Sequence, residues 1–521
     1  MRMKKCNSTR QEVKIDDSMD FIRYGVGMLA SLLLTALLMA PEQPNFVLVM
    51  VDDLGWQDTS LPLHEAPTPF NARYWTPHLE QLARNGMAFT NAYAAGPVCT
   101  PTRTSLMTGQ SPGRTHITYW TLRQGQDTSR PHPTLKAPEW QLNGLKGDED
   151  TLPALLEDGG YQTIHVGKAH FGAHDTPAAD PLNLGFHRNI AGHASGAPAS
   201  FYGKHDFSRA GRTGKEGPGI WDVPGLDAYH GQDIYLTEAL TEEALKEIDL
   251  SVEEDKPFFL HFAPYAVHTP IMPNPRHLDR YTDRDPKEAA YATMIQSYDE
   301  ALGAILDRLE HHGIQDNTIV IFTSDNGGLS AHARGGKPHL HNAPLRSGKG
   351  SAYEGGIRVP TVIHWPGRTE PGTRSDAVIV TYDLFPTILA AAGVSTPDGK
   401  TLDGHDLSSI LSGEIPDREE DRIIGWNQPH QWGASGPGIE PFTSIRQGAW
   451  KLIYFHAGPR FELYDLEHDL GETIDLAESN PDRVRAMAEV MTQWINETGA
   501  QLSRDLETGQ PIQTPAEAAG S

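Results

Sequence analysis

Apolar and polar positions along most of the chain follow a pattern that predicts strands separated by helices. Short apolar or β-branched runs indicate strands at residues 46–51, 162–166, 258–263, 318–323 and 359–364. Several of these runs are continuously apolar, as expected for central strands covered on both faces. Helical periodicity lies between them, most clearly at 287–312. The pattern predicts a large doubly wound, mostly parallel mixed sheet flanked by helices.

The pattern changes after about Leu411. Short strands separated by turns are predicted at residues 423–426, 443–445, 450–455 and 462–466, and a helix at 481–496. This order predicts a smaller C-terminal α+β domain with a short antiparallel sheet. We therefore expect a large α/β domain at 41–411, an α+β subdomain at 412–499 and a frayed polar tail at 500–521.

The N-terminus carries a 16-residue apolar run at 25–40, just after Arg23. The run is short for a membrane span and resembles the core of an export signal. Acidic residues precede it, which favours Met19 as the true start. We expect residues 1–40 to be a cleaved export signal, so that the protein is periplasmic or extracellular and has no stable membrane partner. An uncleaved anchor is the alternative.

Charge and cysteine content exclude several classes of protein. The 521 residues include 43 basic and 68 acidic side chains, for a net charge of −25, so a nucleic-acid partner is not expected. An anionic substrate would need cations supplied by its own binding site. The chain has two cysteines, Cys6 and Cys99, and cannot rely on a disulfide framework. Only Cys99 would remain after signal cleavage.

Acidic and amide side chains follow two of the predicted strands. Asp52 and Asp53 come directly after strand 46–51, and Asp325 and Asn326 come after strand 318–323. Ligands in open α/β sheets collect beyond the carboxyl ends of the strands. An all-oxygen set suits a hard cation such as Ca²⁺ or Mg²⁺. Either pair alone could instead be a helix cap or a turn.

A further motif surrounds Cys99. Residues 99–103 read CTPTR, and residues 106–109 read LMTG. This motif resembles the modification motif of the formylglycine-dependent sulfatases, the arylsulfatase-like branch of the alkaline phosphatase superfamily. Further blocks that are similar to the family follow in the expected order, at residues 160–161, 167–170, 267–270, 325–328, 348–350 and 353–360. The resemblance covers about residues 45–494. Ala169 departs from it, because similar proteins often have a bulky aromatic residue there.

The resemblance implies an alkaline phosphatase-like fold and a specific set of cofactors. Cys99 would be oxidised after translation to formylglycine by a formylglycine-generating enzyme, and the hydrate of that aldehyde would be the nucleophile. The implied metal ligands are Asp52, Asp53, Asp325 and Asn326. Ca²⁺ is the expected ion and Mg²⁺ the alternative.

The resemblance also implies roles for the remaining site residues. Lys168 and Lys349 would contact the sulfate oxygens, and Arg103 would orient the formylglycine hydroxyl. His268 would protonate the leaving alcohol, and His170 would take the proton from the second hydroxyl.

The function implied is hydrolysis of sulfate monoesters. Sulfated carbohydrates are the expected substrates, and aryl sulfates are a further class. The expected partner is a sulfated small molecule or oligosaccharide. One alternative is a phosphonate or phosphate ester hydrolase that uses the same site. A second alternative is a noncatalytic carbohydrate-binding protein with a sulfatase fold.

Overall fold

The computed structural model describes residues 43–330, 334, 337–414, 422–433 and 436–520. The export signal predicted at 1–40, with Met19 as its start, lies outside the described residues, as does Cys6. Residues 44–521 belong to one compact unit. Among the helices of the described ranges, none combines the length and the hydropathy that crossing a bilayer requires.

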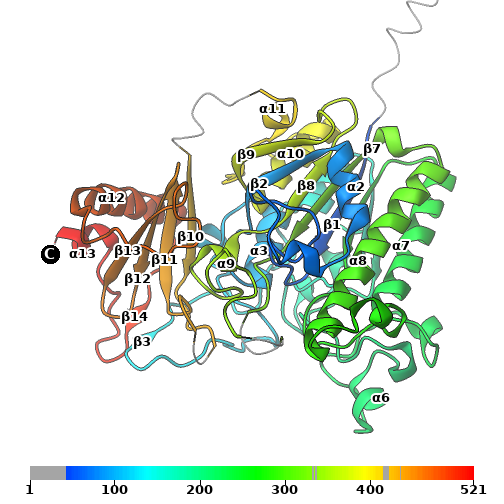
Figure 1. The fold of residues 1–521 in the computed structure, drawn as a ribbon, viewed down its shortest axis with the longest axis horizontal. Helices are drawn as coiled ribbons and strands as arrows, with labels where there is room; N and C mark the ends of the chain where they lie inside the picture. The colour runs from blue at the N-terminus through cyan, green and yellow to red at the C-terminus, as the bar shows by residue number, and fades with distance from the viewer. Residues whose placement is uncertain (1–42, 331–333, 335–336, 415–421, 434–435, 521) are drawn as a thin grey trace, which may run out of the picture. The chain divides into compact units, whose positions relative to one another are not determined.

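An eight-stranded mixed sheet forms the centre of the fold (Figure 1). Its strands, in spatial order, are β5 (Arg188–Ile190), β4 (Gln162–Gly167), β6 (Phe258–Ala263), β1 (Asn45–Val51), β7 (Thr318–Ser324), β8 (Thr361–His364), β2 (Met87–Tyr93) and β9 (Thr373–Val380). Only β8 runs against its neighbours; the other strand pairs are parallel. The predicted doubly wound, mostly parallel mixed sheet is confirmed.

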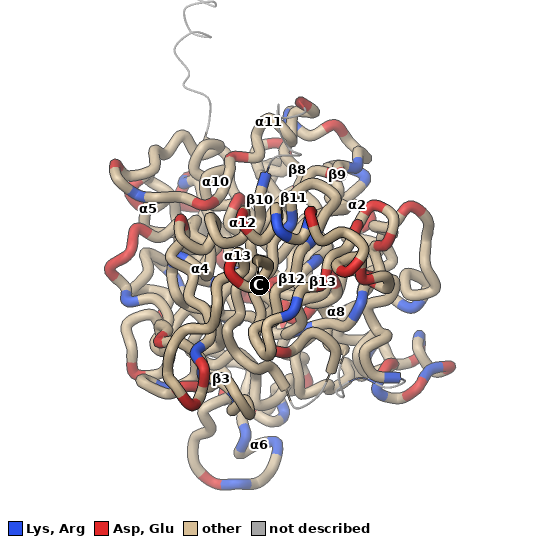
Figure 2. The backbone as a smooth tube through the Cα atoms, turned by 90° about the vertical axis from the view of Figure 1, so that its left-hand side faces the viewer, with Lys and Arg blue, Asp and Glu red and all other residues tan. Residues whose placement is uncertain are grey.

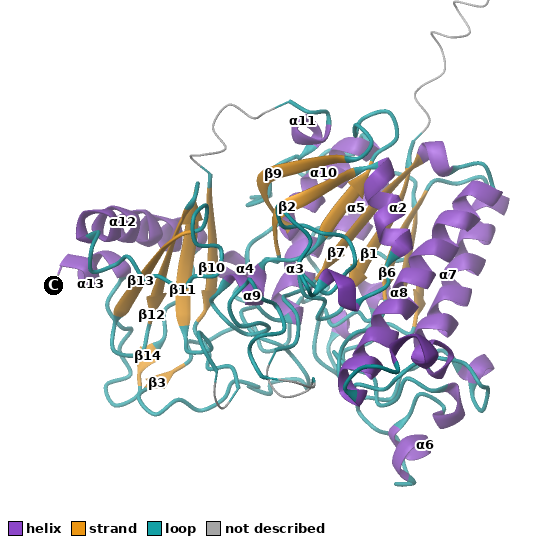
Figure 3. Cartoon of the chain, viewed as in Figure 1, coloured by secondary structure: helices purple, strands orange, loops and turns teal. Residues whose placement is uncertain are grey.

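Helices cover both faces of this sheet (Figure 3). One face packs against α2 (Pro77–Asn85), α7 (Leu236–Glu253) and α8 (Pro286–His311). The other face packs against α3 (Cys99–Thr108), α5 (Leu152–Asp158), α10 (Leu384–Ala392) and α11 (Ser408–Leu411). Shorter helices lie in the connections: α4 (Pro112–Thr115), α6 (Arg209–Thr213) and α9 (Glu354–Ile357).

The central strand β1 shows why its apolar run is continuous. Val47, Val49 and Val51 belong to the core on one face, whereas Phe46 and Leu48 belong to the core on the other. Alternate residues of a strand point to opposite faces, so a strand covered on both sides needs apolar residues throughout.

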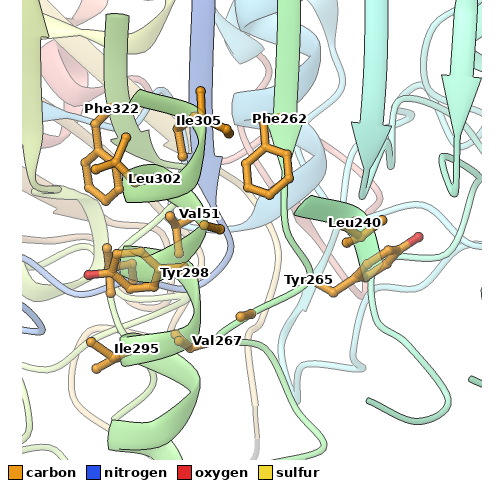
Figure 4. Packing of buried hydrophobic residues seen from close by; sticks show 14 of the residues in the cluster. Val51, Leu240, Phe262, Tyr265, Val267, Ile295, Tyr298, Leu302, Ile305 and Phe322 are labelled. Atoms are coloured by element: carbon orange, nitrogen blue, oxygen red, sulfur yellow. The ribbon is translucent and has the colours of Figure 1, made fainter. Parts of the chain in front are cut away.

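Helix α8 packs its apolar stripe on the first of these faces. The stripe includes Ile295, Tyr298 and Leu302, which are fully buried (Figure 4). They lie in the same core as Val51 and Phe322 of the sheet, which are also fully buried. The spacing of three and four residues places these side chains on one side of the helix. This packing fixes the ends of β1 and β7, where the predicted metal ligands begin.

A second, four-stranded antiparallel sheet follows, which confirms the predicted C-terminal α+β domain. Its strands are β10 (Ile423–Gln428), β11 (Phe442–Gln447), β12 (Trp450–Phe455) and β13 (Arg460–Asp465). One face packs against α12 (Pro481–Thr498), and the other packs against residues of the large sheet and of the segment before β8. Acidic and basic positions are interspersed along the backbone in a view from this side (Figure 2).

The prediction of a frayed tail after Gly499 is wrong. Residues 504–505 form β14 (Arg504–Asp505), which pairs with β3 (Leu135–Lys136), and α13 (Pro515–Gly520) follows. Ala518 and Ala519 pack on the core beneath α12, and the Tyr454 hydroxyl donates to the Gln513 carbonyl over 2.8 Å. Strand pairing with β3, these apolar contacts and several hydrogen bonds hold a segment whose composition is polar.

A buried group of charges joins the small sheet to the segment before β8. Lys451 Nζ lies 2.9 Å from Glu354 Oε1 and 2.8 Å from Glu472 Oε1, and all three side chains are fully buried. Glu354 also accepts from Arg358 Nε over 2.8 Å. Removing one member of such a group leaves an uncompensated buried charge.

We therefore expect Lys451→Met to lower the free energy of unfolding by about 3–5 kcal/mol. The matched control is Arg460→Met on the same sheet, because the Arg460–Glu440 pair is exposed. That variant should lose less than about 1 kcal/mol. Urea unfolding followed by tryptophan fluorescence measures both, and equal losses would contradict the expectation.

Candidate functional site

The carboxyl ends of four adjacent parallel strands supply most of the site. Lys168 follows β4, and His268 lies in the loop after β6. Asp52 follows β1, and Asp325 follows β7. Strand register aligns them: Val51 pairs with Ser324, and Gly167 pairs with Ala263. Asp52 and Asp325 are therefore the first residues beyond two paired positions, which explains how residues far apart in sequence converge.

Cys99 and Lys349 reach the same edge by other routes. Cys99 is the first residue of α3, in the connection after β2, so it lies at the positive end of the helix dipole. Because β8 runs antiparallel to β7, the segment that precedes β8 and carries Lys349 also lies at this edge. Gly327 helps to bring the loops together, since an added Cβ there would lie 1.9 Å from the Gly355 carbonyl oxygen.

The predicted nucleophile lies within reach of the acidic residues. Cys99 Sγ is 3.9 Å from Asp52 Oδ1 and 3.3 Å from Lys349 Nζ. Burial raises the pKa of the Cys99 thiol to about 12, against the opposing effect of Lys168 and Lys349. The unmodified thiol would therefore stay protonated near neutral pH and would be a poor nucleophile.

Three basic side chains pair with three acidic ones in the buried centre. Lys168 Nζ lies 2.7 Å from Asp52 Oδ1, and Lys349 Nζ lies 2.6 Å from Asp53 Oδ1. The third pair joins Arg103 Nε to Asp325 Oδ2 over 2.8 Å. Arg103 also donates to the Lys168 carbonyl over 2.8 Å, which fixes the plane of the guanidinium.

These pairs determine how the acidic groups ionise. Burial raises the pKa of Asp52 well above its usual value, although Lys168 opposes the shift. Burial also disfavours the charged forms of Asp53 and Asp325, but there the neighbouring cations prevail and the pKa of each lies below its usual value. In turn the carboxylates outweigh burial at Lys349 and raise its pKa. The lysines therefore remain charged and can hold an anion.

The two predicted catalytic histidines have defined tautomers. The Thr121 carbonyl can only accept, so His170 Nε2, 2.9 Å away, carries the proton. His170 Nδ1 is then a free base, and it is buried without a hydrogen-bond partner among the described residues. His268 Nδ1 likewise faces the Thr269 carbonyl at 2.9 Å, which leaves Nε2 at 3.6 Å from Asp53 Oδ2. Burial, reinforced for His170 by Lys168 and for His268 by Lys349, lowers both pKa values, that of His268 to about 3.

Two of the predicted site residues have an unusual backbone conformation. Asp53 and His170 have φ angles of 58° and 54°, in the left-handed region that residues other than glycine rarely occupy. Gly196 packs directly on the His170 ring, where an added Cβ would lie 2.3 Å from Cε1. Sequence patterns gave no signal for Gly196 or for the Thr121 carbonyl, because both act through a close approach of the backbone.

The oxygen atoms near Cys99 fit a divalent cation. Asp52 Oδ2, Asp53 Oδ2 and Asn326 Oδ1 are buried and have no hydrogen-bond partner among the described residues. Buried polar atoms normally have partners, so three orphaned oxygens in one place indicate an oxygen-binding ion. Potential ligand atoms of Asp52, Asp53, Cys99 and His268 also lie within 4.8 Å of one another.

Asp325 differs from the other predicted ligands. Its Oδ1 accepts from the Asp53 backbone N–H over 3.1 Å, and its Oδ2 is engaged by Arg103. Asn326 is held by donation from Nδ2 to Asp53 Oδ1 over 2.8 Å, which leaves its carbonyl oxygen for an ion. The structure thus brings the predicted metal residues and the predicted catalytic residues to one edge of the sheet. His170 lies two residues after Lys168, and its Nε2 contacts the Thr121 carbonyl.

The mixed sheet and the buried site at its edge define an alkaline phosphatase-like hydrolase. The family model described as Sulfatase matches residues 44–394, and the one described as N-sulphoglucosamine sulphohydrolase, C-terminal, matches residues 348–500. The chain therefore belongs to the sulfatase family and is a sulfuric ester hydrolase.

Individual relatives agree with this assignment. N-acetylgalactosamine-6-sulfatase of Mus musculus is 33% identical over 395 residues, which covers 73% of this chain and 68% of that protein. Arylsulfatase A of Homo sapiens is 29% identical over 502 residues, covering 88% and 89% of the two chains. The crystal structure of Ps i-CgsB in complex with k-i-k-neocarrahexaose has a TM-score of 0.70 and 26% identity, with coverage of 92% and 97%.

Proposed function

We propose that this protein is an exported, formylglycine-dependent sulfatase that hydrolyses sulfate monoesters of a carbohydrate, with aryl sulfates as further substrates. The observation that carries the proposal is the position of Cys99. It begins α3 within 3.3 Å of Lys349 Nζ and 3.9 Å of Asp52 Oδ1, inside a cluster of orphaned oxygens. A thiol whose pKa is about 12 explains why the site would need a modified nucleophile.

Formylglycine would supply chemistry that cysteine and serine lack. Its hydrate has two hydroxyls on one carbon, so that one can attack sulfur while the other later forms the aldehyde and expels sulfate. This divides one difficult displacement into two easier steps. The formylglycine-generating enzyme is the partner that this maturation requires.

The side chains around residue 99 are suited to the rest of the reaction. Lys168 and Lys349 would hold the sulfate oxygens and offset their charge in a protein whose net charge is −25. Arg103 Nη2, buried without a partner among the described residues, would donate to a hydroxyl of residue 99. Both lysines remain charged, so they can bind the anion and orient it at the same time.

The two histidines would divide the proton transfers. His170 Nδ1, already unprotonated, would accept the proton of the second hydroxyl. His268 would protonate the leaving oxygen through Nε2. Its pKa of about 3 reflects burial and the nearby Lys349, so a sulfate ester placed between Lys349 and His268 would raise it toward the range that a general acid needs.

A divalent cation would be held by Asp52, Asp53, Asp325 and Asn326, and we favour Ca²⁺ over Mg²⁺ because the resemblance to the formylglycine-dependent sulfatases implies it and oxygen ligands suit a hard cation. When bound, such an ion lowers the pKa of a nucleophilic hydroxyl and neutralises sulfate charge. The lysines that now pair with Asp52 and Asp53 could then turn to the substrate.

The substrate class rests on the relatives. One is named for a sulfated amino sugar, and the Ps i-CgsB structure contains an oligosaccharide. We propose a sulfated sugar as the substrate, recognised across the boundary between the 41–411 domain and the 412–499 subdomain. A noncatalytic carbohydrate-binding role is less consistent with the site, because such a protein would be expected to lack at least one of the residues that the family resemblance assigns to catalysis, and this chain lacks none of them.

Cys99→Ala should abolish turnover of sulfate esters, by at least about a thousandfold, because the nucleophile is lost. In the active wild-type protein, the tryptic peptide 85–103 should be about 18 mass units lighter than its unmodified sequence, since an aldehyde replaces the thiol. Cys6→Ala is the matched control and should keep both the mass shift and the activity. An active protein with an unmodified Cys99 peptide would refute the proposal. The same mass spectrum tests export, since the mature chain should begin near residue 41.

Calcium should stabilise the chelator-treated protein through Asp53. At a free Ca²⁺ concentration of 100 times Kd, binding to the native state adds about 2.7 kcal/mol, which a thermal melt detects as a higher Tm. Asp53→Asn should lose this response. Asp465→Asn, in the surface group of Asp465, Glu467 and His468, should keep it. A larger response to Mg²⁺ than to Ca²⁺ would reverse the choice of ion, and an unchanged response in Asp53→Asn would place the ion elsewhere.

Parallel assays on an aryl sulfate and the matching aryl phosphonate should favour the sulfate in kcat/KM. The site has two lysines and a single set of hard oxygen ligands, which suits a singly charged ester, whereas two-zinc phosphatase sites depend on histidine ligands. A higher kcat/KM for the phosphonate would instead establish the phosphonate hydrolase alternative.

A further inference from the structure

A group of aromatic side chains lies next to the nucleophile, and neither the proposed chemistry nor the metal site uses it. We call Tyr119, Trp120, Trp140 and Trp432 the aromatic wall. Tyr119 and Trp140 are buried together with Val98, the residue before Cys99, whereas Trp120 and Trp432 are only partly buried against them. The wall therefore has a packed inner layer and a partly exposed outer layer.

Trp432 is the member that adjoins the reacting groups. The Lys349 ammonium lies 5.8 Å from the centre of the Trp432 ring. The backbone after Lys349 runs directly under the indole, since an added Cβ at Gly350 would lie 1.9 Å from Trp432 Cδ1. Lys349 in turn contacts Cys99, so the indole is one residue removed from the nucleophile.

The indole is held in place from several sides. Tyr119 packs edge-on against it with ring centres 5.8 Å apart, and the Tyr119 hydroxyl donates to the Gln431 carbonyl over 3.0 Å. The backbone N–H of Trp432 donates to the Ile439 carbonyl over 2.9 Å, which fixes the main chain that carries the indole. On the other side of Tyr119, His430 stacks on its ring at 4.8 Å. A rigid aromatic surface loses little entropy when a ligand binds to it.

We propose that the Trp432 indole is the stacking surface for the pyranose ring that carries the scissile sulfate. This inference rests on the proposed function and adds the part of the site that recognises the sugar. Aromatic faces are electron-rich and attract the C–H groups on the flat side of a sugar ring. An ester whose sulfate contacts Lys349 has its sugar carbons a few bonds away, which matches the 5.8 Å separation between the ammonium and the indole.

The position of Trp432 in the chain gives the inference a structural consequence. Trp432 lies in the connection between β10 and β11 of the small sheet, whereas Cys99 follows β2 and Lys349 precedes β8 of the large sheet. The small sheet would thus supply sugar recognition and the large sheet the chemistry. A sugar-binding surface without net charge also suits an anionic substrate whose charge is handled elsewhere by the lysines.

The test compares Trp432→Ala, Trp432→Phe and the control Trp365→Ala with the wild type on galactose, N-acetylgalactosamine and N-acetylglucosamine monosulfates. Trp365 is a partly buried tryptophan that follows β8, at the opposite edge of the sheet. With the best of these sugars, Trp432→Ala should lower kcat/KM at least about tenfold, mainly through KM. Trp432→Phe should stay within about threefold, because an aromatic face remains. Trp365→Ala should resemble the wild type.

Inorganic sulfate as a competitive inhibitor separates stacking from damage to the anion site. If only the sugar surface is lost, the Ki of sulfate should change less than about threefold in Trp432→Ala. A Ki that rises in step with KM would show damage to the anion site and would overturn the inference. A kcat/KM within threefold of the wild type on the sugar sulfates would also overturn it. So would a greater loss on 4-nitrophenyl sulfate than on the sugars, since the stacked group would then be aryl.

Binding measurements keep the inference testable without turnover. In the Cys99→Ala background, each sugar monosulfate is titrated and followed by calorimetry, and adding Trp432→Ala should raise Kd at least about tenfold. An unchanged Kd would refute the stacking role. An unmodified Cys99 peptide, or no turnover of any sulfate ester by the wild type, would instead refute the proposed function, so the two failures are distinguishable.

Discussion

The site depends on the electrostatic balance among buried acidic and basic side chains. Asp52, Asp53 and Asp325 lie close together and fully buried, and their mutual repulsion would make it costly to ionise all three. The site offsets this with Arg103, Lys168 and Lys349, each paired with one carboxylate at 2.6–2.8 Å. Any cation that enters must compete with these pairs, and any anion that enters must recruit the same lysines. Binding of a cation and binding of an anion at this site would therefore be coupled through the same charges.

Strand register makes this balance possible. Because β1 and β7 pair with Val51 opposite Ser324, the two acidic motifs begin at the same level of the sheet. The antiparallel strand β8 is equally important, since a parallel strand at that place would deliver the segment before it, with Lys349, to the opposite edge. The left-handed backbone at Asp53 and His170 then turns the side chains into the site. The strain is tolerated because the surrounding packing leaves the backbone no alternative.

Much of the fold could be predicted from the sequence, where the signal was local. The predicted strands 258–263 and 450–455 coincide with β6 and β12, since each is a short apolar or aromatic run. Strand β9 was missed because it lies at the sheet edge, where exposed polar residues occupy its first half. Helix α7 was also missed, although its apolar positions Leu236, Leu240 and Ile248 repeat at helical spacing and could have been found.

Some of the site residues could likewise be predicted from the sequence, and others could not. Residues such as Asp53 and Lys349 lie in segments that resemble sulfatase motifs, so their convergence could be predicted from that resemblance, and the structure joins them in an ion pair. Gly196, the Thr121 carbonyl and Trp432 contribute through backbone approach and tertiary packing, which leave no mark on the local sequence.

The small sheet has two physical connections to that reaction centre. At one, Lys451 neutralises Glu354, which lies five residues after Lys349 and would otherwise be buried with too little positive charge. At the other, the connection between β10 and β11 places Trp432 over the backbone beside Lys349. The short segment around Lys349 is therefore held on one side by a buried ion pair and covered on another by an indole. These two contacts restrict the backbone from which the long, flexible Lys349 side chain extends toward Cys99.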